Sequence, residues 1–145
     1  MSQTAQPATE VFLALKLDSS EIMLSFENAN NWQERYRQIM LLGKTLPKLG
    51  EEFRVEQAQV RGCESNAWLY HTVIEGKHYF LADSDARIIK GLVALLLAAC
   101  HGKSSEEIAT FDIEGYFDQL GLTGQLSPSR TNGLFALAKA IKTAA

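Results

Sequence analysis

The sequence has few metal-binding and disulfide-forming residues. Its 145 residues include only two cysteines, Cys63 and Cys100, and no Cys-x-x-Cys pair. Three histidines stand apart at positions 71, 78 and 101. A structural zinc site needs about four Cys or His ligands at short spacings, so no zinc centre is expected. Two lone thiols without an export signal are expected to be reduced and cytosolic, not joined in a disulfide.

Long apolar runs and positive charge are also scarce. The longest unbroken apolar run, Leu92 to Cys100, has nine residues, whereas a helix needs about 20 to cross a bilayer. Residues 1–8 lack the basic start and apolar core of a secretory signal. The net charge of −3 argues against a strongly basic nucleic-acid binder. We therefore expect a cytoplasmic protein that acts on neither membranes nor nucleic acids.

The composition is that of an ordinary globular domain. Hydrophobic residues make up 46% of the chain and charged residues 21%. Because one domain typically uses about 100–200 residues, we expect residues 1–145 to form a single domain. Residues 1–8 are small and polar and are expected to form a mobile tail.

Periodicity and capping signals predict helices on both sides of a small sheet. A strand pair is expected at 67–74 and 77–82, joined by a turn at Glu75-Gly76. Residues 53–60 are a candidate third strand. Apolar periodicity and caps predict helices in 9–28, from 31 to Pro47, in 85–101, from 104, in 113–120 and from 127. The order of helices, antiparallel sheet and helices is typical of the α+β class, here with about three strands.

Cys63 has the local context of a reactive thiol. It follows Gly62, which permits a tight turn, and Arg61, which favours a thiolate. If Glu75-Gly76 is the turn, Trp68 lies opposite Asp83, and Cys63 comes toward the start of the apolar helix. Partial positive charge at a helix start lowers the pKa of a nearby thiol. The alternative is a small, buried and inert cysteine.

Other polar residues have simpler interpretations. Cys100 ends an apolar helix and is expected in the core. Asp83 and Asp85 are interpreted as helix caps and not as an acid–base pair. Arg130 lies in the first turn of the last helix, where a cation opposes the helix dipole. It is either a functional cation or an exposed arginine whose stem covers apolar surface.

Four segments together resemble the SufE/CsdE family of sulfur acceptors, over about residues 28 to 143. They are Asn31 to Pro47, Gly62 to Leu69, Asp83 to Leu92 and Leu126 to Leu134. The resemblance implies a fold similar to iron–sulfur scaffold proteins, with a three-stranded antiparallel sheet packed with helices. It also implies that Cys63 accepts sulfur, and that Asp85 and Arg130 match the family's acidic and basic motif residues near that cysteine.

The family resemblance also implies a partner and a reaction. The Cys63 thiolate would take the outer sulfur of a cysteine desulfurase persulfide and pass it to a downstream recipient or scaffold for iron–sulfur cluster assembly. Pyridoxal phosphate would belong to the desulfurase, and this chain would need no cofactor and no metal. We expect Arg130 to stabilise the anionic sulfur, and Asp85 to cap its helix or pair with Arg130.

Two other functions stay open. An iron–sulfur scaffold would bind the cluster itself, but it needs three or more thiolate ligands. This chain has two, 37 positions apart (100 minus 63). A regulator would bind and stimulate the desulfurase without carrying sulfur, and the sequence does not separate a regulator from a carrier.

Overall fold

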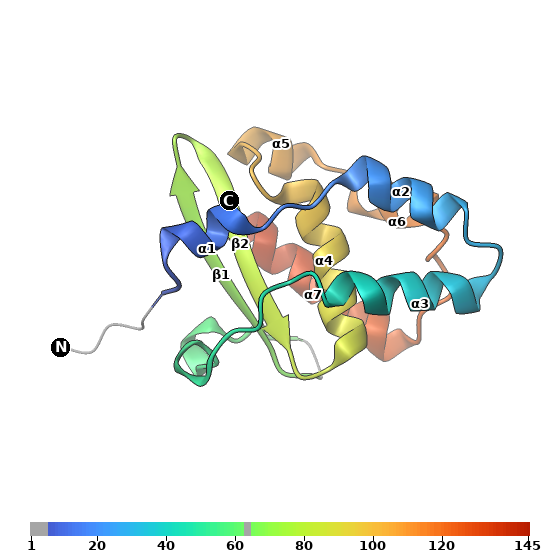
Figure 1. Ribbon diagram of the computed structural model, residues 1–145, viewed down its shortest axis with the longest axis horizontal. Helices are drawn as coiled ribbons and strands as arrows, with labels where there is room; N and C mark the ends of the chain where they lie inside the picture. The colour runs from blue at the N-terminus through green and yellow to red at the C-terminus, as the bar shows by residue number, and fades with distance from the viewer. Residues whose placement is uncertain (1–5, 63–64) are drawn as a thin grey trace.

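The computed structural model describes residues 6–62 and 65–145, which form one two-stranded sheet surrounded by helices. Figure 1 shows the helix α4 between the hairpin on one side and α2 and α3 on the other. The elements are α1 (Thr9–Ala14), α2 (Ser19–Glu27), α3 (Trp32–Gly43), β1 (Ala67–Ile74), β2 (Lys77–Ser84), α4 (Arg87–Cys100), α5 (Ser105–Thr110), α6 (Ile113–Gln119) and α7 (Pro128–Ala144). The expected α+β class is confirmed.

The helix α4 is the centre of the core. Eleven of its fourteen residues are buried, because it packs against β2, α2, α3 and α7. Two glycines allow its close approach to α3. A Cβ on Gly91 would overlap the carbonyl oxygen of Ile39, and one on Gly43 would lie 2.9 Å from the Gly91 amide nitrogen. A sequence that is apolar almost all round therefore forms a helix that is buried on most sides.

The hairpin has the predicted register. Glu75 and Gly76 both have positive φ, at 52° and 77°, as a two-residue turn of type I′ requires. Trp68 pairs with Asp83, as expected from that turn. Because β2 contacts both α1 and α4, consecutive residues such as Phe80 and Leu81 are fully buried. The strand β2 extends to Ser84, two residues beyond the predicted end.

The predicted third strand is wrong for the described residues. Residues 53–60 instead contain parts of two 3₁₀ turns, η1 (Glu51–Phe53) and η2 (Glu56–Ala58). Only Gln59 forms an isolated bridge, to Trp68. The chain turns away immediately afterwards, because Gly62 has a φ of 92°. A strand cannot extend through two helical turns and a left-handed glycine.

Helix caps follow the sequence signals. The Ser104 hydroxyl accepts from the Glu107 amide, and the Glu107 carboxylate accepts from the Ser104 amide, so α5 begins with the predicted capping box. The Ser127 hydroxyl accepts from the Arg130 amide, with Pro128 as the first residue of α7. These caps satisfy amides that have no partner within the helix.

The N-terminal helix is attached to the sheet through His101. The Nδ1 atom of His101 accepts from the Phe80 amide, and the Nε2 atom of His101 donates to the Phe12 carbonyl, each across 3.0 Å. Burial lowers the pKa of this imidazole, which favours the neutral ring. Gln6 donates to the His71 carbonyl. The mobile tail expected for residues 1–8 falls mostly on residues 1–5, outside the described part of the chain.

Candidate functional site

The predicted nucleophile, Cys63, lies outside the described residues together with Glu64, but its flanks are defined. Before it, Gly62 lies against α7, where an added Cβ would stand 3.2 Å from the Cβ of Ala136. After it, Asn66 directly precedes β1. The segment that carries Cys63 therefore starts at the side of α7 and ends at the first strand.

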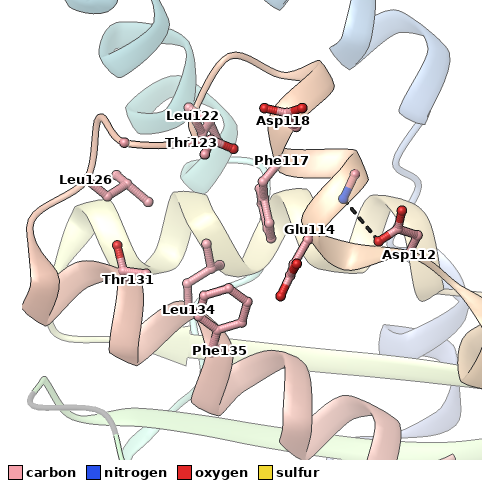
Figure 2. Close-up of a pocket in the computed structure, with 12 residues that line it drawn as sticks. Asp112, Glu114, Phe117, Asp118, Leu122, Thr123, Leu126, Thr131, Leu134 and Phe135 are labelled. Atoms are coloured by element: carbon pink, nitrogen blue, oxygen red, sulfur yellow. Dashed lines mark hydrogen bonds between the residues drawn. The ribbon is translucent and has the colours of Figure 1, made fainter.

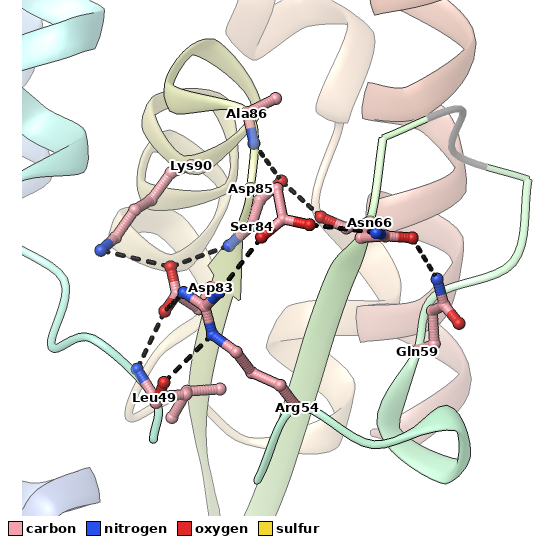
Figure 3. Close-up of polar contacts among 9 residues, drawn as sticks. All are labelled: Leu49, Arg54, Gln59, Asn66, Asp83, Ser84, Asp85, Ala86 and Lys90. Carbon is pink, nitrogen blue, oxygen red and sulfur yellow. Dashed lines mark hydrogen bonds and ion pairs between the residues drawn. The ribbon is translucent and has the colours of Figure 1, made fainter. Parts of the chain in front are cut away.

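Asn66 connects that segment to the end of β2 and the start of α4 (Figure 3). Its carbonyl accepts from the Ser84 hydroxyl across 2.6 Å and from the Asp85 amide across 3.2 Å. Its side-chain amide donates to Asp85 across 3.0 Å, and its oxygen accepts from Gln59 across 2.7 Å. The hairpin register thus brings Asp85 next to the flank of the Cys63 segment. The predicted approach of Cys63 itself lies outside the described residues.

A buried carboxylate, Asp83, lies beneath these contacts. It accepts from the amides of Leu49 (2.9 Å) and Ser84 (2.8 Å) and from Arg54 Nη2 (2.7 Å), and Lys90 Nζ lies 3.2 Å away. Burial by itself would raise the pKa of Asp83. The Arg54 hydrogen bond, the two amides and the Lys90 charge outweigh burial and hold that pKa below its usual value.

Arg54 joins the two carboxylates that flank Ser84. One guanidinium nitrogen contacts Asp83, and the other lies 3.1 Å from Asp85. The guanidinium carbon also stands 4.9 Å from the centre of the Trp68 ring, a cation–π contact. The chain from Leu49 to Arg54 is therefore held against the end of the hairpin.

The expected roles of Asp85 and Asp83 as helix caps are wrong. The residue that precedes α4 is Ala86, and no side chain caps the helix there. The nearest substitute is the Ser84 hydroxyl, which accepts from the Ala86 amide across 3.1 Å. Asp85 pairs with Arg54 instead. The carboxylates of Asp83 and Asp85 both face the segment before the hairpin, which carries Arg54.

Arg130 is half-buried in the first turn of α7. Among the described residues its side chain forms no ion pair, and the expected pair with Asp85 is not formed. Arg130 lies six residues before Ala136, which contacts the Gly62 position, so about 9 Å of helix separates them.

A groove of about 700 Å³ borders the same segment. Its walls are the chain from Ala58 to Gly62, Leu69 of β1 and one side of α7. Most of the lining is apolar, and it includes two cations, Arg61 and Lys139. The groove is open to solvent directly beside the residue that precedes Cys63.

The Cys100 thiol and the imidazoles of His71 and His78 are not part of this site. Cys100 is buried, and burial raises the pKa of its thiol to about 11. His71 and His78 bond to each other across 2.6 Å at the far end of the hairpin, and His78 also contacts Ser105. Within residues 6–62 and 65–145, no three His, Cys, Asp or Glu side chains are grouped to hold a metal.

Comparison with known proteins decides the family. The sequence model of the SufE family, described as an Fe-S metabolism associated domain, matches residues 20–145 of this chain. The chain belongs to the SufE family. The resemblance seen in the four sequence segments is confirmed.

Two curated relatives match most of the chain. The sulfur acceptor protein CsdE of Escherichia coli strain K12 is 44% identical over 118 residues, which are 81% of this chain and 80% of that protein. An uncharacterised SufE-like protein of Rhizobium etli is 40% identical over 140 residues, or 94% of this chain and 93% of that one.

The fold also occurs in a solved structure. The solution structure of a hypothetical protein from Thermus thermophilus has a TM-score of 0.68 to this SufE-family chain, with 19% identity. It covers 88% of this chain and 94% of that one. At this identity the likeness establishes the fold alone.

Sequence reasoning missed the contacts that Arg54 and Asn66 make. It also missed that Asp83 is a buried carboxylate in an ion pair. Arg54 contacts carboxylates 29 and 31 residues away, a separation that no local pattern reveals. The only available signal was that the register placed Trp68 opposite Asp83, and hence the chain before β1 near the chain after β2.

Proposed function

We propose that this chain accepts sulfur from a cysteine desulfurase onto Cys63, stimulates that enzyme, and delivers the sulfur toward iron–sulfur cluster assembly. The observation that carries the proposal is the 44% identity to a protein named as a sulfur acceptor, within the SufE family. The likeness extends over about four-fifths of both chains.

The two cysteines have unequal chemistry. The Cys100 thiol is 2% exposed, and its pKa of about 11 keeps it protonated at neutral pH. A thiolate is the attacking form, so Cys100 is unsuited to accept sulfur. Cys63 is then the acceptor that we propose, on the strength of the Gly62-Cys63 motif and its polar neighbours.

The transfer is an exchange between sulfur atoms. The Cys63 thiolate attacks the outer sulfur of the desulfurase persulfide, a new S–S bond forms at Cys63, and the enzyme's S–S bond breaks. The desulfurase cysteine leaves as a thiolate and keeps the bonding electron pair. No external oxidant or reductant is needed, because one S–S bond replaces another.

We propose that Asp85 and Arg130 support this exchange in different ways. Asp85 receives the side-chain amide of Asn66, three residues after Cys63, and thereby positions the segment. Arg130 is a permanent cation without an ion pair among the described residues, and we assign to it the stabilisation of the anionic sulfur.

The proposal extends to the cofactor, the cellular location and the domain organisation of the protein. The partner supplies pyridoxal phosphate, and this chain needs neither a cofactor nor a metal of its own. We place the protein in the cytoplasm as a single domain over residues 1–145. None of the helices within the described ranges is long and apolar enough for a membrane span.

Intact mass after incubation with a cysteine desulfurase and cysteine tests the proposal. Wild type and Cys100→Ser should each gain one sulfur, about 32 Da, since the mechanism forms a persulfide on a single thiol. Cys63→Ser should gain none while its circular dichroism stays unchanged. A gain that depends on Cys100 would contradict the assignment.

The same experiment separates the alternatives. Stimulation of the desulfurase without any mass gain would identify a regulator. A cluster or metal bound at one per chain and lost in Cys63→Ser would identify a scaffold.

A further inference from the structure

A second groove, of about 500 Å³, lies on the other side of α7. We name it the α6–α7 groove: it lies between those two helices and the loop that joins them (Figure 2). Phe117 of α6 extends toward α7, and Leu134 and Phe135 lie opposite it (Figure 2). The apolar lining is completed by Leu122 and Leu126 of the loop. Phe135 is 43% exposed, although it is a large aromatic side chain.

The charged side chains that line this groove are all acidic. They are Asp112, Glu114 and Asp118, and each is exposed to solvent. Asp112 already accepts from the Gly115 amide as the cap of α6. Glu114 and Asp118 form no ion pair within the described residues. An apolar floor therefore has two available carboxylates at its rim, and no lysine or arginine among its described lining residues.

We propose that the α6–α7 groove docks a basic amphipathic segment of a partner protein. One bulky apolar side chain of that segment packs against the exposed ring of Phe135, above the buried side chains of Phe117 and Leu134. Burial of this apolar surface provides the binding free energy. Lysine or arginine residues on either side pair with Glu114 and Asp118, which selects the partner by charge. Anionic ligands such as nucleic acid or acidic lipid are disfavoured by the same carboxylates.

This surface is separate from the proposed sulfur-transfer site. The helix α7 presents Thr131, Leu134 and Phe135 to the α6–α7 groove, and Ala136 and Lys139 to the groove beside Gly62. A protein bound between α6 and α7 thus leaves the Cys63 side of the helix free. The proposal concerns a binding surface beyond sulfur acceptance and does not depend on Cys63.

The test uses two short synthetic peptides and ¹⁵N-labelled full-length protein. The first peptide has a central tryptophan between lysines and arginines, and the matched peptide has glutamates in their place. We expect the basic peptide to shift the amide resonances of α6, α7 and their loop, with affinity falling as salt is raised. The acidic peptide should leave these resonances in place.

Charge reversal provides the matched variants. Glu114→Lys combined with Asp118→Lys should weaken the basic peptide at least about tenfold, because two attractions become repulsions. Glu10→Lys with Glu106→Lys changes the net charge equally on exposed positions elsewhere and should leave the affinity unchanged. Phe135→Ser tests the apolar part separately and should also weaken binding.

Three results would overturn the proposal. The first is a basic peptide that shifts the groove resonances no more than the acidic peptide does. The second is binding that survives the Glu114 and Asp118 reversals at full affinity. The third is a concentration-dependent shift of the groove without peptide, together with the mass of two chains, which would identify a second copy of this chain as the occupant.

Discussion

The guanidinium of Arg54 donates to the buried carboxylate of Asp83 across 2.7 Å, although 29 residues separate them in the chain. This contact holds the segment before the hairpin against the end of β2. The same guanidinium reaches Asp85, which binds Asn66 beside the proposed acceptor segment. The ion pair therefore supports the flank of the site from within the core.

Loss of the Arg54 guanidinium should destabilise the fold. In Arg54→Met the apolar stem can still cover Trp68, but Asp83 loses its shortest hydrogen bond. Hydrogen bonds to charged groups contribute about 1.5–3 kcal/mol, and we expect a loss of this size in urea denaturation. Arg37→Met is the control, because its ion pair with Glu34 is exposed and contributes less than about 1 kcal/mol. Equal losses in both variants would contradict the role of Arg54.

The pH dependence of stability should report the ionisation of Asp83. Its pKa is lowered in the folded state from an unfolded value of about 3.9. The stabilising contribution is present above the unfolded pKa and is lost as the pH falls through the folded pKa. Wild type should therefore lose stability below about pH 4 more steeply than Asp83→Asn, measured by urea denaturation at each pH. Parallel curves would show that Asp83 is not linked to folding.

The Cys100 thiol should resist alkylation in the folded protein. It is buried, and its raised pKa of about 11 leaves little thiolate at pH 8. In Cys63→Ser, iodoacetamide at pH 8 should add no mass to the native protein and one adduct after denaturation in urea. Rapid native labelling of this variant would show that Cys100 is accessible, and would weaken the assignment of sulfur transfer to Cys63.

The pKa of Cys63 should depend on Arg130. We read it from the pH dependence of alkylation in a Cys100→Ser background, so that a single thiol reports. Replacing Arg130 with alanine should raise that pKa, because a nearby cation favours the thiolate. Arg37→Ala, which removes an exposed cation from α3, should leave it unchanged. An unchanged pKa in the Arg130 variant would assign this residue to docking the desulfurase instead.

Asp85 should position the Cys63 segment without promoting ionisation of the thiol. Asp85→Ala removes the acceptor of the Asn66 side chain and should make Cys63 more exposed. At pH values well above the thiol pKa, this variant should therefore be alkylated faster than wild type in the same Cys100→Ser background. An unchanged rate would show that the segment is held by other contacts, such as the Ser84 hydroxyl on the Asn66 carbonyl.

The close packing of α3 against α4 can be tested by the sign of one change in stability. Replacing glycine by alanine within an exposed helix normally stabilises it by about 1 kcal/mol. Gly91→Ala should destabilise the protein instead, since the new Cβ overlaps the Ile39 carbonyl, and overpacking of a core costs about 1–3 kcal/mol. Thermal unfolding measures the effect. A raised melting temperature would show that the two helices separate at little cost.

Sequence alone determined the features that depend on nearby residues. The Glu75-Gly76 turn set the hairpin register because a two-residue turn leaves one pairing. Ser104 with Glu107, and Ser127 before Pro128, marked helix starts because caps act within one helical turn. The apolar pattern around Leu92 marked the central helix, and the family motifs around Cys63 indicated the chemistry.

Tertiary structure decided which distant groups meet, apart from the strand pairing that the hairpin turn set. Residues 53–60 lack a third strand because their turns and the contacts of Arg54 hold the chain at the end of the hairpin, not alongside it. Asp85 binds Arg54 and Asn66 and does not cap α4. These partners lie 31 and 19 positions away, so no local sequence pattern reveals them. Such contacts depend on how the packed helices and sheet bring segments together, and that packing is a property of the whole chain and not of any local pattern.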